Sequence, residues 1–177
     1  MTEEFARRLE VMAATTASQV SPADVDEARR LGDEGGGYLA IQLLLETLRS
    51  TPGTLNTSLL DSSRIVIFDG RGAERERQPS ALATLARDGL DRAYGGGAAV
   101  SAPFMLASRI ERAGFAPVKD SIGRVVAVVA VEAEPSYLAE LGRLGSRLLL
   151  STLVIGLAIV VLGAVIFRVT QIGRAHV

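Results

Sequence analysis

The spacing of apolar residues predicts three helices in the first third of the chain. Between residues 3 and 20 the apolar positions recur every three or four residues, which is the period of an amphipathic helix. A second, shorter helix is expected after Ser21, a favourable N-cap that is followed by Pro22 at the first helical position. Residues 38 to 50, YLAIQLLLETLRS, follow a chain break at the glycines 35 to 37 and predict a third, strongly apolar helix.

From residue 55 the pattern changes to the alternation that is typical of strands. Residues 55 to 61 and 64 to 70 predict two short strands, the second of which ends in an Asp-Gly turn signal. A helix is expected from about residue 80 to residue 94. The segments AAVSAPF at 98 to 104 and ASRIERAGFAPV at 107 to 118 predict further strands.

The last predicted strand, RVVAVVAVEA at residues 124 to 133, is apolar at both alternating positions. It follows the hairpin loop KDSIG at 119 to 123. A strand of this kind is covered on both faces, so we expect it in the centre of its sheet. Together the elements predict an α+β fold, in which helices flank a five-stranded, mainly antiparallel sheet.

An uncharged run of 20 residues, LLLSTLVIGLAIVVLGAVIF, occupies positions 148 to 167. At about 1.5 Å per residue, a helix of this length matches a hydrocarbon core of about 30 Å. Buried core helices are usually shorter and carry a polar edge, so the run favours a transmembrane helix. We expect a continuous helix from Pro135 to about Gln171, with residues 135 to 147 as its juxtamembrane part.

Small residues recur along this predicted helix and would lie on one face of it. They are Gly142, Thr152, Gly156 and Gly163. Small side chains let two helices approach closely, so this face is a candidate dimer contact. Membrane helices contain glycine often in any case. It therefore stays open that these residues only reflect the usual composition of such helices.

The arginine count around the run weakly places the N-terminal domain in the cytoplasm, because Arg143 and Arg147 precede the run and Arg168 follows it. The chain starts with MTEEFARRLE, which holds no apolar segment that could carry a domain across a membrane. Its last six residues, IGRAHV at 172 to 177, match what a common sequencing-library adapter encodes in one reading frame. We therefore expect a truncated protein with a non-native tail.

Composition excludes several classes of function. The 177 residues are 48% hydrophobic with a net charge of -1, which suits one ordinary domain and gives no basic stripe for nucleic acid. The chain has no cysteine and a single histidine, His176, so thiolate and internal imidazole chemistry are excluded. No nucleotide or catalytic motif exceeds chance. The sequence thus predicts no enzyme activity, no cofactor and no metal site in this fragment.

A few residues are candidates for binding a small ligand. Arg112 lies inside a predicted strand, where it could clamp a carboxylate or phosphate or could be an exposed charge at the edge. Tyr94, Phe104 and Phe115 surround the predicted sheet and could line a cavity, although aromatic residues at such positions also form cores. Glu132, near the end of the last strand, completes this set of ligand-binding candidates.

Two segments resemble a known family. RIVIFDGRG at 64 to 72 is similar to the strand and Asp-Gly turn of Cache-type, PAS-like extracytoplasmic sensor domains, and GFAPVKDSIGRVVAVVAVEA at 114 to 133 is similar to their final hairpin. These domains belong to bacterial transmembrane receptors, especially sensor histidine kinases. The resemblance implies a Cache-like domain at 1 to 134 with a long N-terminal helix, a small-ligand pocket and a signalling output beyond the second membrane helix.

The same resemblance implies a periplasmic or extracellular domain attached to the inner membrane, against the local arginine count. It also implies a homodimer and a ligand such as an organic acid or amino acid. No pocket signature of the family carries over residue by residue. Two other hypotheses stay open at this point: a tail-anchored binding or scaffold protein, and an enzyme domain held at a membrane.

Overall fold

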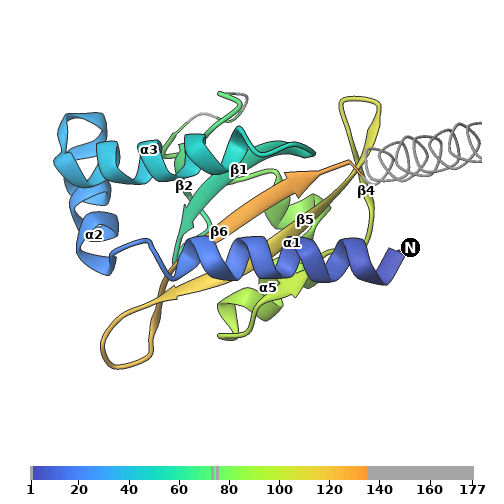
Figure 1. The fold of residues 1–177 in the computed structure, drawn as a ribbon. Coiled ribbons are helices and arrows are strands. Elements are labelled where there is room, and N and C mark those ends of the chain that lie inside the picture. Colours follow the sequence, from blue (N-terminus) through green and yellow to red (C-terminus); the bar gives the residue numbers. More distant parts are fainter. Residues whose placement is uncertain (1, 73, 75, 135–177) are drawn as a thin grey trace, which may run out of the picture. The chain divides into compact units, whose positions relative to one another are not determined.

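The computed structural model describes residues 2 to 72, 74 and 76 to 134. It has an α+β architecture in which one antiparallel sheet is covered by helices on both faces (Figure 1). Three helices come first in the chain, as the sequence predicts. They are α1 (Thr2–Ala17), α2 (Pro22–Leu31) and α3 (Gly36–Arg49), with a short 3-10 helix (Gly32–Glu34) between the last two.

The sheet follows these helices, and every pairing in it is antiparallel. The strand order is β2-β1-β6-β5-β3, and β4 pairs with β5 outside this path. Strand β6 lies in the centre and is buried on both faces, which confirms the expectation from its apolar pattern. The strands are β1 (Thr54–Asp61), β2 (Val66–Asp69), β3 (Ala99–Val100), β4 (Phe104–Leu106), β5 (Arg109–Lys119) and β6 (Val125–Ala133).

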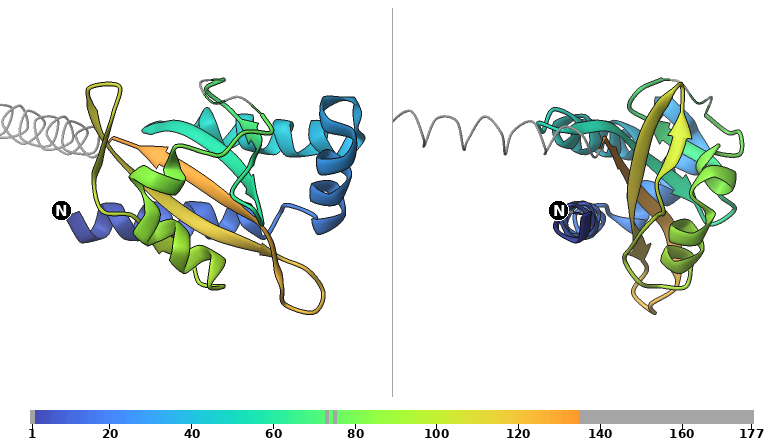
Figure 2. Two further views of the ribbon diagram at one scale, coloured as in Figure 1. Left: turned by 180° about the vertical axis from the view of Figure 1, so that it is seen from behind. Right: turned by 90° about the vertical axis from the view of Figure 1, so that its right-hand side faces the viewer.

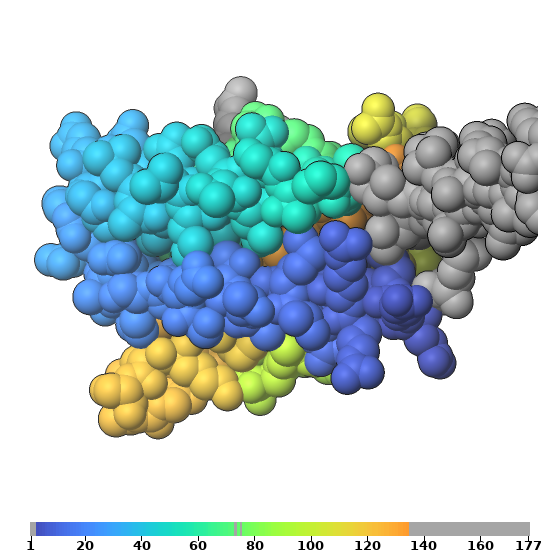
Figure 3. Space-filling model, in the orientation of Figure 1, coloured from blue at the N-terminus to red at the C-terminus, as the bar shows by residue number. Residues whose placement is uncertain are grey.

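Helices α1, α2 and α3 cover one face of the sheet (Figure 3). Helix α1 packs against β5 so closely that backbone meets backbone. A Cβ atom at Gly114 would lie only 2.5 Å from the carbonyl oxygen of Leu9. Glycine at this position therefore sets the distance between α1 and the sheet.

The opposite face carries α4 (Leu82–Leu85) and α5 (Arg87–Tyr94), as the edge-on view in Figure 2 shows. A hydrophobic core fills the space between these two helices and the sheet. Leu90 and Phe115 are fully buried there, with Val128 of the central strand. This helix pair replaces the single helix predicted for residues 80 to 94, because the backbone leaves helical geometry at Ala86, with φ -126° and ψ 33°.

Two other element boundaries differ from the prediction. Helix α3 already begins at Gly36, two residues before the predicted start. Its second residue must be glycine, because a Cβ atom at Gly37 would collide with the backbone of Asp24. The predicted strand at 98 to 104 contains only β3 and the first residue of β4.

The predicted transmembrane run at 148 to 167 and the small residues on its proposed dimer face lie outside the described residues, as does the tail at 172 to 177. Within the part of the chain that the structure describes, no helix has both the length and the apolar character needed to cross a bilayer.

Candidate functional site

Strand register gathers polar side chains on the face of the sheet that α4 and α5 cover. Glu132 on β6 lies directly opposite Asn56 on β1 and opposite Ala113 on β5. Glu111 is two residues before Ala113, so its side chain points to the same face and is a diagonal neighbour of Glu132. Asn56, Glu111 and Glu132 are therefore brought together from three strands.

One arginine, Arg71 in the loop after β2, contacts both acids. Its Nη2 lies 3.3 Å from Oε2 of Glu111 and 3.7 Å from Oε2 of Glu132. The two glutamate side chains are only 1% and 3% exposed, whereas that of Arg71 is 29% exposed. We call Asn56, Asp69, Arg71, Glu111 and Glu132 the acidic cluster.

The amide of Asn56 has a fixed orientation. Its Nδ2 donates to Oδ1 of Asp69 at 2.6 Å and to Oε1 of Glu132 at 2.9 Å. The reverse orientation would turn the amide oxygen toward two carboxylates, so the assignment follows from the contacts. As a result, Oδ1 of Asn56 takes no part in these two hydrogen bonds.

Three buried polar atoms at this place have no hydrogen-bond partner. They are Oδ1 of Asn56, Oε2 of Glu132 and Oγ of Ser58, the next inward residue of β1. None of these three residues is more than 4% exposed. Each buried polar atom without a partner costs roughly 1 to 3 kcal/mol, so the arrangement lowers the stability of the folded domain.

The pKa of Glu132 is raised to about 8, mainly by burial. The neighbouring Glu111 contributes to this rise, while the hydrogen bond from Asn56 and the charge of Arg71 act in the opposite direction. Glu132 is therefore largely protonated at neutral pH. A positive charge brought to this place would favour its ionised form.

A hollow of about 410 Å³ adjoins the acidic cluster. Arg71 and Glu111 line it, together with Leu55 of β1 and Ala107 and Arg109 of the β4–β5 hairpin. This volume lies within the range of small-molecule sites, about 300 to 1,000 Å³. The hollow thus connects solvent to Glu111 and Arg71 of the acidic cluster.

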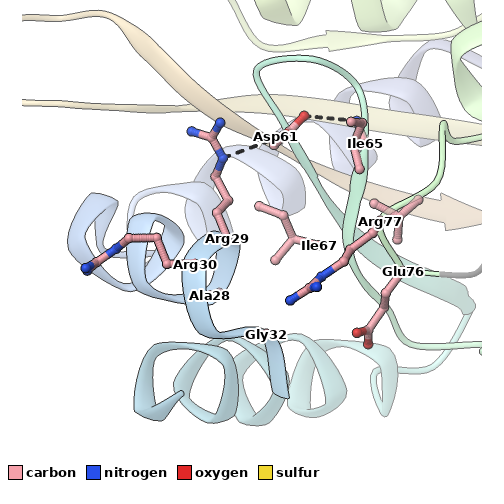
Figure 4. Close-up of a pocket in the computed structure, with 10 residues that line it drawn as sticks. Ala28, Arg29, Arg30, Gly32, Asp61, Ile65, Ile67, Glu76 and Arg77 are labelled. Carbon is pink, nitrogen blue, oxygen red and sulfur yellow. Dashed lines mark hydrogen bonds and ion pairs between the residues drawn. The ribbon is translucent and has the colours of Figure 1, made fainter. Parts of the chain in front are cut away.

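A second hollow, of about 330 Å³, lies between α2 and β2 (Figure 4). Arg29 and Arg77 reach into it, and we call it the α2 hollow. Nε of Arg29 lies 3.6 Å from Oδ2 of Asp61, whose other oxygen accepts a hydrogen bond from the backbone N–H of Ile65 at 3.0 Å. The side chain of Arg29 is 42% exposed, so water reaches these charges directly.

The sequence-predicted binding residues occupy different places. Glu132 belongs to the acidic cluster. Tyr94, Phe104 and Phe115 come together in or against the hydrophobic core under α4 and α5, and the hydroxyl of Tyr94 donates to the backbone carbonyl of Asp61. By strand alternation Arg112 points to the opposite face from Glu111, and its Nε and Nη2 donate to the carbonyl of Ser101 at 3.1 and 3.0 Å. Ligand binding by these residues stays a prediction.

The other four residues of the acidic cluster are not among the binding residues predicted from the sequence: Asn56, Asp69, Arg71 and Glu111. A signal for Glu111 was present, because it shares the alternation of the inward-facing Ala113 and Phe115. A charged residue at an inward position of a strand indicates either a buried ion pair or a ligand site. Arg71 lies in a loop, where no periodicity marks its direction.

No family model matches the chain, and no curated protein matches it. Among solved structures, the sensor domain of DcuS from E. coli aligns with a TM-score of 0.59 at 22% identity, covering 78% of this chain and 94% of that domain. The sensor domain of the histidine kinase DctB from V. cholerae aligns with a TM-score of 0.54 at 12% identity, covering 78% of this chain and 51% of its own length. The described part of the chain therefore has the PAS/Cache-like fold of sensor domains, as the resemblance in its final hairpin implies.

Proposed function

We propose that residues 1 to 134 are a small-ligand sensor domain of a bacterial transmembrane receptor and that the ligand binds at the acidic cluster. The observation that carries this proposal is the meeting of two features. Glu111 lines a hollow of about 410 Å³ and lies beside buried polar atoms without partners, in a fold shared with solved sensor domains. A domain that only had to be stable would gain by filling such a place with apolar side chains.

The finer parts of the proposal concern the rest of the protein. The apolar run at 148 to 167 supports attachment to the inner membrane. The resemblance of the final hairpin to extracytoplasmic sensor domains supports a position of the domain outside the cytoplasm. The similarity to the sensor domain of the histidine kinase DctB supports a histidine kinase or a related output beyond the membrane. The small residues in the predicted membrane helix support a homodimer in which this face pairs. No catalysis is proposed for this fragment.

The central strand supplies a route for the signal. Glu132 lies at the end of β6, three residues before Pro135, where the predicted rod to the membrane begins. A ligand that binds one state of the domain more tightly than the other shifts the ratio of the two states. A difference of about 1.4 kcal/mol in binding free energy changes this ratio tenfold. Binding and output are then coupled through one strand.

A ligand screen on the full chain in mild detergent tests this function. A ligand present at 100 times its dissociation constant stabilises the folded state by about 2.7 kcal/mol, which raises the melting temperature by several degrees. We expect a hit among amino acids, linear amines and short dicarboxylates, and we expect Glu132→Ala to abolish it. A hit that survives this substitution would move the binding site elsewhere in the domain.

A further inference from the structure

We propose that the ligand of the acidic cluster carries an ammonium group, held by Glu132, Asn56 and Glu111. This inference rests on the proposed function, because it assumes that the cluster is the ligand site. It specifies the chemistry of the ligand, which the fold alone leaves open between anions, zwitterions and cations.

Charge balance is the first argument. Glu111 and Glu132 are both buried, and within the described part of the chain Arg71 is the one cation with which either forms an ion pair. An anionic ligand would place further negative charge beside these two carboxyl groups, and like charges at such distances repel strongly where water is excluded. A cation supplies the charge that the pair lacks.

The second argument comes from the hydrogen-bonding character of the atoms without partners. Oδ1 of Asn56 can only accept, and its orientation is fixed by the two acids that its Nδ2 contacts. Oε2 of Glu132 accepts once the group is ionised, and Oγ of Ser58 can accept as well. The missing partner is therefore a donor. An ammonium group offers three donors and no acceptor, whereas an ionised carboxylate offers acceptors and no donor.

Two arginines, Arg71 and Arg109, line the hollow together with Glu111, and Arg109 is solvent-exposed. We call the part of the hollow beside these arginines its mouth. A carboxylate at the far end of an amine-bearing ligand would meet these guanidinium groups, as in an amino acid. Every ligand of this class must carry an ammonium group at one end. A diamine and a zwitterion differ only in the group at the other end, which would lie at the mouth.

Proton linkage gives the inference a signature of its own. The charged and polar groups that face Glu132 are Asn56 from β1, Arg71 and Asp69 from β2 and the loop after it, and Glu111 from β5. An ammonium ligand favours the ionised form of Glu132, whose pKa is raised, so its binding releases a proton near neutral pH. Affinity for an amine then rises with pH between about 6 and 8, approaching tenfold per pH unit, whereas affinity for a dicarboxylate falls.

Four-carbon probes of matched length test the inference by titration calorimetry on the full chain in mild detergent. They are 1,4-diaminobutane, 4-aminobutyrate, succinate and 1,4-butanediol, with the twenty amino acids and magnesium chloride as further arms. We expect binding by amine-bearing compounds, tighter at pH 8 than at pH 6, and none by succinate, butanediol or magnesium. Binding of the diamine without the zwitterion would show that the mouth does not require a carboxylate, and the ammonium inference would still hold.

Other outcomes overturn it in distinguishable ways. Succinate or magnesium binding without any amine would refute the ammonium inference and leave ligand sensing intact. If no compound binds at 10 mM, the inference and the proposed function fail together.

Amide variants identify the groups responsible. Glu132→Gln keeps the shape of the side chain and removes its charge, so we expect at least a tenfold loss of amine affinity and loss of the pH dependence. Glu111→Gln should reduce affinity as well and serves as a second variant if the first folds poorly. Glu4→Gln, a solvent-exposed site on α1, is the matched control. Equal affinities for Glu132→Gln and Glu4→Gln would overturn the assignment.

Discussion

The acidic cluster and the α2 hollow are both lined by charged residues and differ little in volume, about 410 against 330 Å³ for the adjoining spaces. Their environments differ. The arginines of the α2 hollow are open to water, and Arg29 pairs with Asp61, which also accepts backbone hydrogen bonds. In the cluster, the two acids are almost fully buried and share one guanidinium, and Oδ1 of Asn56 and Oγ of Ser58 on β1 have no hydrogen-bond partner.

This difference shows why burial indicates function better than charge does. Water satisfies the exposed groups of the α2 hollow at little cost in stability, so their presence requires no ligand. The groups of the cluster lower stability when the domain is empty, and a bound donor would restore it. Four predictions test this contrast, in descending order of expected effect.

The largest effect is expected from pH. The pKa of Glu132 is higher in the folded than in the unfolded state, so the stability from its neutral form is complete at pH 4 and is lost as the pH rises through about 8. Each pKa unit corresponds to about 1.4 kcal/mol, so the wild type loses a few kcal/mol at most between pH 5 and 9. Urea unfolding at both pH values, compared with Glu132→Gln, measures this loss. Equal losses in the two proteins would contradict the raised pKa.

Removal of Arg71 comes next. Arg71→Ala leaves two buried carboxyl groups without their cation, and protonation relieves only part of the cost. We expect a loss of about 2 kcal/mol at pH 7, below the usual range for a buried pair because Arg71 is partly exposed. Arg29→Ala in the α2 hollow should cost less than about 1 kcal/mol. Thermal unfolding of both variants measures the two losses of stability. Equal losses would contradict the difference expected between the acidic cluster and the α2 hollow.

Two hydroxyl deletions on neighbouring residues of β1 should have opposite signs. Ser58→Ala removes a buried Oγ without a partner and should stabilise the empty domain by about 1 kcal/mol. Thr57→Val removes the bond from Oγ1 to the carbonyl of Leu45, 2.9 Å long, and should destabilise by about 1 kcal/mol. Chemical denaturation resolves changes of this size. A destabilised Ser58→Ala variant would mean that its hydroxyl already has a partner.

The smallest effect is expected at Arg77. Its exposed side chain reaches across the α2 hollow toward Gly32, and Arg77→Ala should change stability by less than about 0.5 kcal/mol. Ligand affinity should stay unchanged in the same calorimetric titrations. A drop in affinity would shift attention from the acidic cluster to the α2 hollow.

Much of this fold follows from the sequence, because its strands and helices carry clear local periods. Residues 124 to 133 are apolar at both alternating positions, which predicted a central strand, and the Asp-Gly signal after residue 68 predicted the end of β2. The break at Ala86 was missed, since neither glycine nor proline marks it. The short strand β4 was not predicted as a separate element, and its first residue fell within the strand predicted at 98 to 104. Its formation depends on pairing with β5, which the local pattern does not show.

The site was less accessible to sequence reasoning. Glu132 was among the predicted residues, but its partner Asn56 is 76 positions away, and their contact depends on the register between β1 and β6. Register over that separation is set by the packing of the whole sheet rather than by local pattern. Arg71 enters the cluster through a loop conformation, which no periodicity records.

The contact between Gly114 and Leu9 has a mechanical consequence. At this point main chain rests on main chain, and no side chain separates α1 from β5 there. A shift of the strand at Gly114 is therefore expected to move the adjoining turn of α1 with it. Even a single methyl group at position 114 would act as a wedge and lift α1 away from the strand beneath it.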